Sequence, residues 1–301
     1  MHLLVTTSHS FLLVDTDSNK SISLDRGHGL YYGIARAGKH LYVAVRNRLV
    51  SSEIPQAEER GEILIFDQAL QLCGSLPTPR FPLRDLHEIA WHDGKLFATC
   101  SYDDMIAIWD GAHWESWFPL GAIPEGVGEA YHFNSFMFDQ ERGVIWIVAH
   151  NKGPSELLAF SVSTRELVER VALGHWAHNL WQEENQLFTC SSFDGQILGN
   201  QGFLLETGGF PRGIAFDKKC RCIGISELAE RSARDFTMGK LMLYDRNWNF
   251  KKEIALPGEG LINDMQCVPD GFRHGGRSAP ISSLIARVKA MARKIHDATF
   301  E

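Results

Sequence analysis

The 301-residue sequence predicts an all-β fold, a six-bladed β-propeller closed by its N-terminal strands. A pattern of strand, polar turn and strand recurs at intervals of about 34 to 55 residues, near the spacing of four-stranded propeller blades. The two ends of the chain hold incomplete repeats, and each supplies what the other lacks. The eight Trp and eighteen Phe also suit β-rich packing.

Six segments begin the repeat, five with its first two strands and the last with its first strand alone. They are "YYGIARAGKHLYVAVRN" from residue 31, "LHEIAWHDGKLFATCSYD" from 86, "FNSFMFDQERGVIWIVAHNK" from 133, "AHNLWQEENQLFTCSSFD" from 177, "PRGIAFDKKCRCIGISE" from 211 and "INDMQCVPDG" from 262. A third strand usually follows, as in "ILIFDQ", "IAIWDG", "LLAFSV" and "LMLYDR", and then a fourth, such as "GSLPTP" or "KKEIALPG".

The last repeat has only its first strand before the sequence changes character at Gly271. At the other end, "HLLVTTS", "SFLLVDTD" and "KSISLD" match strands two, three and four. We therefore expect residues 1–271 to form one domain whose N-terminus completes the last blade, which leaves no open sheet edge in the ring. Two stacked β-sandwiches would not explain why both ends supply parts of one repeat, and no residues remain for a seventh blade.

Residues 272–301 form a basic tail with six Lys and Arg against two Asp and Glu. Apolar residues recur there at helical spacing, which predicts an amphipathic helix at about 280–297. This helix either docks on the flank of the propeller or contacts a protein or membrane surface through residues 280–300. Its apolar face holds Ile281, Leu284, Ile285, Val288, Met291, Ala292 and Ile295.

Composition excludes several classes of function. The net charge of −7 argues against nonspecific binding to nucleic acid or anionic membranes. No apolar run approaches the roughly 20 residues of a membrane-spanning helix, and the N-terminus lacks the basic region of a signal peptide. "GEGL" and "GVGEA" fall between strands, so they are loops and not phosphate-binding motifs, and we expect no nucleotide cofactor.

The six cysteines are expected to be reduced thiols of a cytoplasmic protein. Cys100 and Cys190 occupy matching points of two repeats and are expected to be buried as small apolar residues. Cys220 and Cys222 are separated by one residue, which is not the spacing of zinc ligands.

In a propeller the innermost strands start, and the second strands end, on the same face, here called the top. The aligned repeats therefore predict which side chains meet at its mouth. The first position holds Tyr32, His87, Asn134, His178, Arg212 and Asn263, and the second holds Gly33, Glu88, Ser135, Asn179, Gly213 and Asp264. Second-strand ends add Arg46, Asn47, Asp103, His150, Asn151, Asp194 and Glu227. His132 lies two residues before Asn134 and is expected to point the same way.

These residues differ from blade to blade, which suits asymmetric binding of a polar small molecule. We predict His87, His132 and His178 as ligands of a divalent metal ion, with His178 also suited to proton transfer. Glu88 or Asp264 would act as base, and Arg212 would hold an anionic group. The remaining substrate-binding candidates are Tyr32, Asn134, Asn179, Asn263 and Arg46. The alternative is a water-filled channel with a polar rim.

Long loops cluster at the same end of the predicted fold. The segments 46–62 and 226–240 extend the connection between second and third strands, and residues 77–85 and 119–132 connect blades. Long loops at one end of a rigid scaffold commonly carry binding or gating.

With these repeats aligned, the chain resembles the broad NHL and SMP-30/gluconolactonase-like group of six-bladed propellers. The motifs "HEIAW", "YHFNSF", "AHNLW", "FPRGIAF" and "INDMQ" also resemble an uncharacterised group of bacterial propeller proteins carrying a domain of unknown function. Resemblance to SMP-30-like lactonases implies a divalent cation held by Glu, Asn, Asn and Asp. Glu88, Asn134 or Asn179, and Asp264 would supply part of that set, while the surrounding histidines depart from it.

Two classes of function follow. The first is a small-molecule enzyme acting at the mouth, a metal-assisted hydrolase, lyase or isomerase on a polar or anionic substrate. The second is a non-catalytic propeller that binds a ligand or a protein partner. The histidine-rich, nonrepeating mouth favours the first class, and the lack of a recognised nucleophile–base motif favours the second.

Overall fold

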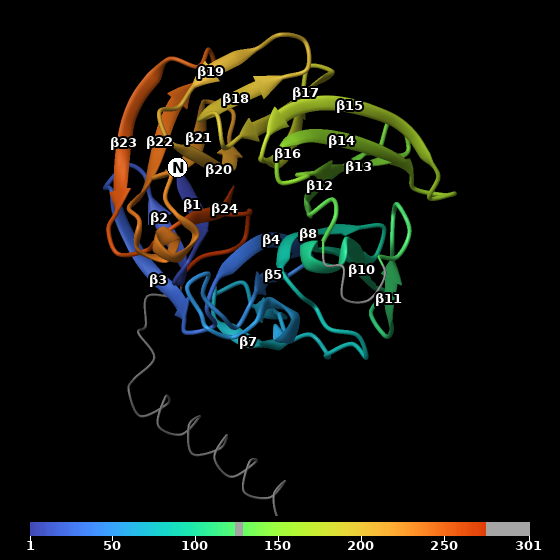
Figure 1. Cartoon of the computed structure of the whole chain (residues 1–301). Coiled ribbons are helices and arrows are strands. Elements are labelled where there is room, and N and C mark those ends of the chain that lie inside the picture. The colour runs from blue at the N-terminus through green and yellow to red at the C-terminus, as the bar shows by residue number, and fades with distance from the viewer. Residues whose placement is uncertain (124–128, 275–301) are drawn as a thin grey trace, which may run out of the picture.

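The computed structural model, which describes residues 1–123 and 129–274, is a six-bladed β-propeller (Figure 1). Each blade is an antiparallel sheet of four strands, and the fold prediction is confirmed. Blades 1 to 3 consist of β4 (Tyr31–Ala37), β5 (His40–Val45), β6 (Glu62–Phe66) and β7 (Leu72–Ser75); β8 (Leu86–His92), β9 (Lys95–Cys100), β10 (Met105–Trp109) and β11 (Trp114–Trp117); and β12 (Phe133–Asp139), β13 (Val144–Ala149), β14 (Pro154–Ser161) and β15 (Leu167–His175).

Blades 4 to 6 repeat this order around the ring. They consist of β16 (Ala177–Glu183), β17 (Gln186–Ser191), β18 (Gln196–Gly199) and β19 (Leu204–Glu206); β20 (Phe210–Phe216), β21 (Cys220–Ser226), β22 (Gly239–Asp245) and β23 (Phe250–Leu256); and β24 (Ile262–Cys267), β1 (His2–Thr7), β2 (Ser10–Asp15) and β3 (Lys20–Arg26). The helical elements of the described residues are the short 3₁₀ helices η1 (Gln56–Glu58), η2 (Ser101–Asp103) and η3 (Arg231–Phe236).

The ring closes as the incomplete repeats predict. Strand β24 pairs antiparallel with β1, with Leu3 opposite Cys267 and Val5 opposite Met265. The N-terminal strands β1, β2 and β3 thus complete the blade that β24 begins, and β24 in turn contacts β4 of blade 1. This pairing leaves no innermost strand without neighbours on both sides.

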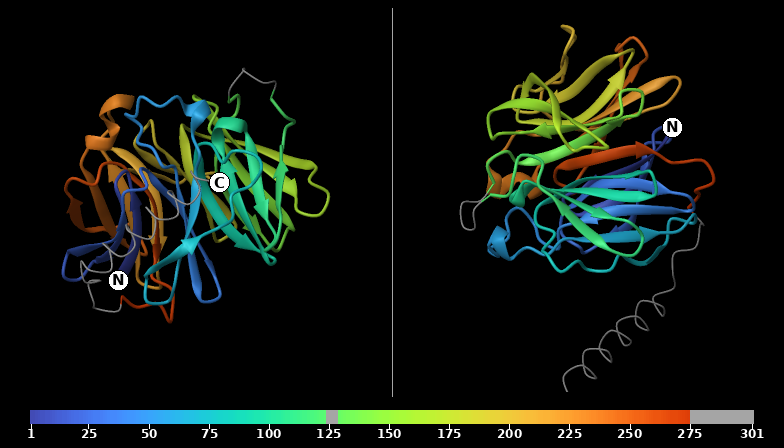
Figure 2. Two further views of the ribbon diagram at one scale, coloured as in Figure 1. Left: turned by 90° about the horizontal axis from the view of Figure 1, so that it is seen from below. Right: turned by 90° about the vertical axis from the view of Figure 1, so that its right-hand side faces the viewer.

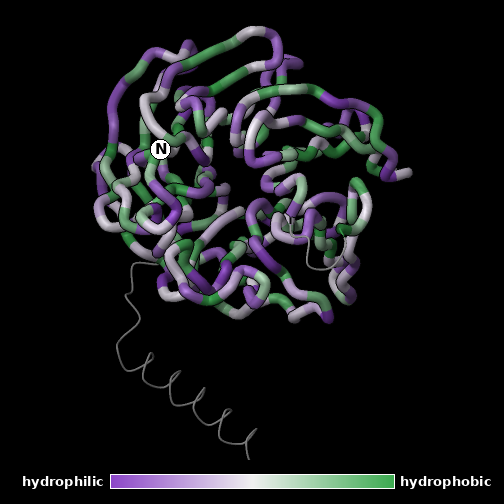
Figure 3. Tube along the Cα trace, in the orientation of Figure 1, coloured by the Kyte–Doolittle hydropathy of each residue, from purple (hydrophilic) through white to green (hydrophobic). Residues whose placement is uncertain are grey.

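The hydrophobic core is divided into six apolar clusters, each between two neighbouring blades. Strand β1 shows why: Leu3 and Val5 pack toward blade 5, whereas Leu4 packs toward blade 1. Successive side chains of a strand point to opposite faces, so a strand buried on both faces carries apolar residues at consecutive positions. Figure 3 shows the resulting hydrophobic stretches in the blades. Cys100 and Cys190 lie fully buried in two of these clusters, as predicted.

The innermost strands share an irregularity at the mouth that positions the site. In blade 2 the pairing register shifts between Leu86 and Ile89, and in blade 4 between His178 and Leu180. Equivalent shifts lie between Tyr31 and Ile34, between Phe133 and Ser135, between Arg212 and Ile214, and at Asn263. A bulge breaks the alternation of side chains. Two consecutive residues of each strand, such as His87 and Glu88, can therefore both face the central channel.

Two long loops, which the sequence placed on the top face, meet there (Figure 2). The backbone N–H of Ser51 donates a hydrogen bond of 2.7 Å to the carboxylate of Asp235, and Arg231 donates one of 3.3 Å to the side chain of Gln56. His9 of blade 6 lies 2.7 Å from the carbonyl oxygen of Asp235. The loops of blades 1 and 5 thus join over blade 6.

The predicted helix at 280–297 lies outside the described residues. Within residues 1–123 and 129–274, no helix combines the length and apolar character that crossing a bilayer requires. All six cysteines are free thiols.

Candidate functional site

A cavity of about 340 Å³ opens at the mouth of the propeller, where the sequence placed the site. Of the predicted residues it is lined by Tyr32, Arg46, His87, His132, His150, His178 and Arg212. A narrow space of about 10 Å³ continues below it between the predicted residues Glu88, Asn134, Asn179, Asn263 and Asp264. These two sets of predicted residues therefore form two levels of one channel. Five residues at the ends of second strands were wrongly expected at the mouth and line neither space: Asn47, Asp103, Asn151, Asp194 and Glu227.

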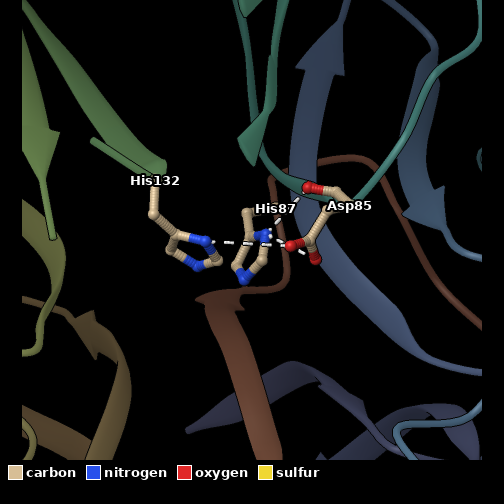
Figure 4. Close-up of side chains that lie close together, drawn as sticks. All are labelled: Asp85, His87 and His132. Carbon is tan, nitrogen blue, oxygen red and sulfur yellow. Dashed lines mark hydrogen bonds and ion pairs between the residues drawn. The ribbon is translucent and has the colours of Figure 1, made fainter. Parts of the chain in front are cut away.

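Three side chains at the wall of the cavity come together as a candidate metal centre (Figure 4). Asp85, His87 and His132 each offer a ligand atom, and these atoms lie within 4.8 Å of one another. Asp85 and His87 belong to the start of blade 2, and His132 directly precedes β12 of blade 3. Two imidazoles and one carboxylate form a donor set common to divalent transition metals.

The backbone before the innermost strands directs two of these groups into the cavity. Asp85 and His132 both adopt positive φ angles, 54° and 52°, immediately before β8 and β12. His132 thus reaches the mouth from a left-handed turn and not through the strand alternation expected from its distance to Asn134. The carboxylate of Asp104 accepts hydrogen bonds from three successive backbone N–H groups, including that of His132 at 2.6 Å, and so fixes this turn.

The protonation of His87 fits a metal ligand. Its Nδ1 lies 2.9 Å from the carbonyl oxygen of Asp85 and 3.0 Å from the hydroxyl of Ser101. Burial lowers the pKa of His87 to about 3, although the charge of Asp85 opposes this shift. The ring is therefore neutral at neutral pH, as metal binding requires.

A buried ion-pair network holds Asp85 in place. Arg46 donates two hydrogen bonds, of 2.9 and 2.6 Å, to the carboxylate of Glu59 and forms an ion pair with Asp85. Burial opposes the ionisation of Asp85, but the charges of Arg46, His87 and His132 hold its pKa well below the usual range. The guanidinium of Arg46, predicted to bind substrate, is thus engaged on both sides by carboxylates.

Two further histidines, His150 and His178, line the cavity wall beyond the candidate metal centre. The ring of His150 lies 4.9 Å from that of His132 and 5.1 Å from that of His178, centroid to centroid. Nδ1 of His150 accepts a hydrogen bond from the backbone N–H of Lys152 (3.1 Å), so the neutral ring carries its proton on Nε2. Burial, assisted by the charges of His132 and Arg212, lowers the pKa of His150 far below its ordinary value.

Arg212 lies at the far end of this wall and is only 6 % exposed. It donates hydrogen bonds to Nε2 of His178 and to the side-chain oxygen of Asn263 (3.3 Å), while its Nε has no partner among the described residues. Burial lowers its pKa. In the part of the chain that the structure describes, Arg212 forms no ion pair with a carboxylate, which is unusual for a buried guanidinium.

Two carboxyl groups predicted as bases, Glu88 and Asp264, lie at the lower level. Burial, followed by the charge of Asp264, raises the pKa of Glu88 well above its ordinary value. Burial likewise raises the pKa of Asp264 to about 7, despite a backbone hydrogen bond of 3.2 Å from Ile34. Asn179 donates to Asp264 (3.4 Å) and accepts from the backbone N–H of Gly213 (2.6 Å).

The remaining predicted residues connect neighbouring blades. Asn134 donates to the carbonyl oxygen of Ala177, and Asn263 donates to that of Tyr31, both at 2.9 Å. Tyr32 packs on His87 with 4.3 Å between ring centroids. These contacts hold the innermost strands of adjacent blades in a fixed arrangement around the channel.

Sequence reasoning missed several cavity residues that share one place in the repeat. This place lies two positions before the first mouth residue of each innermost strand. Besides the predicted His132, it holds Asp85, Trp176, Phe210 and Leu261, all of which line the cavity. Extending the repeat alignment upstream by two residues would have found them.

A second sequence feature that identifies cavity residues lies at the ends of the second strands. In three blades a serine hydroxyl at this point bonds to the next blade. Ser101 donates to the carbonyl oxygen of Phe133 (2.6 Å), Ser192 donates to that of Pro211 (2.7 Å), and Ser226 accepts from the N–H of Ile262 (3.0 Å).

Blades 1 and 3 carry Arg46 and His150 at the same point, and both line the cavity. In these two blades, other residues form the hydrogen bond to the next blade. Glu59 accepts a hydrogen bond of 2.7 Å from the backbone of Asp85, and Ser155 accepts one of 2.9 Å from the first residue of β16. A departure from the repeated serine thus marks a residue that faces the site.

A larger cavity, of about 460 Å³, lies between blades 2 and 3 beside His92, Phe97 and Phe138. His92 stacks on Phe138 with 3.8 Å between ring centroids, so its imidazole face is covered. Among the described residues, the cluster of potential metal ligands lies at the mouth, and we therefore place the site there.

No model of a protein family matches this chain, and no curated protein matches it. Among solved structures, a chain of the nidogen–laminin complex is similar, with a TM-score of 0.62 and 12 % sequence identity. The alignment covers 88 % of this chain and 97 % of that chain. At this level of identity the likeness supports the six-bladed propeller fold alone.

Proposed function

We propose that the protein is a metal-assisted enzyme that acts on a small polar molecule at the mouth of the propeller. One observation carries this proposal: Asp85, His87 and His132 offer ligand atoms within 4.8 Å of one another at the wall of a cavity of about 340 Å³. A divalent ion held there would act as a Lewis acid or activate a water molecule, which suits a hydrolase, lyase or isomerase.

Neighbouring groups would bind the substrate or hold and transfer protons. His150 presents an N–H that can donate to a bound substrate, because its Nδ1 is already an acceptor. His178 has Nε2 engaged by Arg212, so its predicted roles as ligand or proton carrier require that hydrogen bond to open. Glu88 and Asp264 line the narrow channel below the cavity, where a raised pKa suits them to hold a proton.

Elemental analysis of untagged protein purified without chelators tests the metal centre. We expect near-stoichiometric divalent metal that is lost in Asp85→Asn and His87→Ala and retained in His113→Ala, which removes an exposed histidine. Asp264→Asn tests instead the lower cation site that the resemblance to SMP-30-like lactonases implies. Equal metal content in all four variants and the parent would rule out metal-assisted chemistry in this channel.

A second candidate is a propeller that binds a protein partner without catalysis. Exposed apolar side chains on the joined top loops favour it, with Phe236 74 % exposed. The others are Ile54, Leu228 and Met238. Such residues on one surface are typical of interaction sites. If Phe236→Ser abolished cross-linking to a purified partner while Asp85→Asn did not, this surface and not the cavity would carry the function.

The free state of all six thiols supports our prediction of a cytoplasmic location. Fractionation of cells that express the full chain would test this prediction.

A further inference from the structure

The charges around the mouth cavity are unevenly distributed. Asp85 and Glu129 lie beside the histidines at the candidate metal centre. Arg212 and Arg234 flank the ring of Phe210, with their guanidinium carbons 5.0 and 5.7 Å from its centroid. The carboxylates of Asp85 and Glu129 are paired with Arg46 and Lys152, which also line the cavity. The cavity therefore has one wall of paired carboxylates and a basic wall.

The two arginines of the basic wall lack counter-charges. Within residues 1–123 and 129–274, neither Arg212 nor Arg234 forms an ion pair with a carboxylate. Burial lowers the pKa of Arg234, and the charges of Arg212 and Arg231 lower it further. Glu230 also lines the cavity and partly offsets this repulsion without pairing with Arg234. One buried and one half-buried cation that repel each other are costly unless an anion joins them.

The geometry of Arg212 fits such an anion. It is 6 % exposed, lines the cavity and has an Nε–H without an acceptor among the described residues. Its other bonds, to His178 and Asn263, use NH2 and NH1 and fix the plane of the guanidinium. A fixed, planar fork of donors is the group that proteins use to bind carboxylates and phosphates.

We propose that Arg212 and Arg234 form an anion subsite, which holds a carboxylate or phosphate group of a substrate whose other end lies at Asp85, His87 and His132. The role of that other end rests on the proposed function. The wall between the two sites is short, with His150 between His132 and His178 at centroid distances of 4.9 and 5.1 Å. The substrate is thus a small molecule with an anionic group at one end and a polar reacting group at the other.

Calorimetric titration of the full chain tests the subsite at low ionic strength, after divalent metal and chelator have been removed by dialysis. The probes are malonate, inorganic phosphate and the neutral analogue malonamide. We expect malonate or phosphate to bind and malonamide not to bind, and the anion that binds identifies the group as a carboxylate or a phosphate. Arg212→Gln should weaken binding roughly ten- to hundredfold, the loss of one charge-assisted hydrogen bond.

Arg234→Gln on η3 gives a second variant outside the strands in case Arg212→Gln does not fold, and it too should weaken binding. Arg80→Gln removes an exposed arginine and should leave the affinity unchanged. Absence of anion binding by the parent, or binding by both subsite variants as tight as that of the parent, would overturn the subsite and leave the metal centre standing. Anion binding, together with no metal in the separate elemental analysis of the untagged parent, would support the subsite while removing the metal-assisted mechanism.

Discussion

Arg212 donates a hydrogen bond to Nε2 of His178. A guanidinium has donors only, so this nitrogen must hold its lone pair toward Arg212. Nδ1 of His178 lies 2.9 Å from the hydroxyl of Ser192, which itself donates to the carbonyl oxygen of Pro211 at 2.7 Å. The ring is therefore neutral, with its proton on Nδ1.

This relationship predicts that His178 resists protonation. Burial, and then the charge of Arg212, hold the pKa of His178 well below its ordinary value. In ¹⁵N NMR spectra of the imidazole groups, assigned with His178→Gln, the ring should show one protonated and one unprotonated nitrogen from pH 8 down to pH 6. An imidazolium pattern at pH 6 would contradict this arrangement.

The lower carboxyl groups predict a loss of stability at alkaline pH. The pKa of Asp264 is raised to about 7, so between about pH 4 and 7 the folded protein binds a proton that the unfolded chain has released. Stability from this group is complete below its unfolded pKa and is lost as pH rises through 7. We expect the melting temperature to fall on the order of 3 °C between pH 6.5 and 8. Glu88, whose pKa burial also raises, adds to the trend.

Asp264→Asn should flatten this alkaline fall, and Asp93→Asn in an exposed turn should preserve it. The buried histidines lower the stability at acidic pH instead. Because the pKa of His87 is lowered to about 3, the unfolded chain gains a proton below about pH 6.5 that the folded protein does not, and stability falls there. Scanning calorimetry across pH 5 to 8 should thus show a maximum, and an unchanged alkaline limb in Asp264→Asn would refute the assignment.

The ion-pair network behind Asp85 predicts a large effect from a small change. Glu59→Gln keeps the shape of the side chain but removes the charge that two hydrogen bonds from Arg46 neutralise. Breaking a buried pair in this way costs about 3 kcal/mol. Urea unfolding should show a lower midpoint for Glu59→Gln, while Glu58→Gln at the exposed neighbouring position should match the parent. Equal midpoints would mean that the network contributes nothing to folding.

Close packing of innermost strands predicts intolerance at Gly33. A Cβ at this position would lie 2.5 Å from the backbone nitrogen of Ile89 and 2.7 Å from the carbonyl oxygen of His87. Backbone atoms cannot yield as a flexible side chain can, so Gly33→Ala should cost on the order of 3 kcal/mol and displace His87. Gly153→Ala, whose Cβ would approach nothing closer than 3.8 Å, is the matched control. Thermal unfolding of the two variants compares them, and equal stability would argue against the close approach.

The repeat predicted the positions of many site residues, but it did not predict which of their side chains contact one another. The alignment placed His87, His132 and Arg212 at one mouth because equivalent strands begin at the same level of a propeller. It did not show that Asp85 belongs with His87, since a residue before a strand has no fixed direction until its backbone angle is known. The φ of 54° at Asp85 supplies that direction. Likewise, the sequence gives no sign that Arg46 meets Glu59, because a loop of twelve residues separates them.

The sequence by itself determined the six blades and their closure, because alternating apolar residues and turn spacing act locally and recur along the chain. It also determined that the innermost strands begin at the mouth and present His87, His178 and Arg212 there. Only the tertiary structure decided which contacts those residues make at the mouth. Register shifts in the innermost strands bring consecutive residues such as His87 and Glu88 into two levels of the channel, and contacts between blades pair Arg212 with His178. These features depend on distances between segments far apart in the chain, which local pattern does not encode.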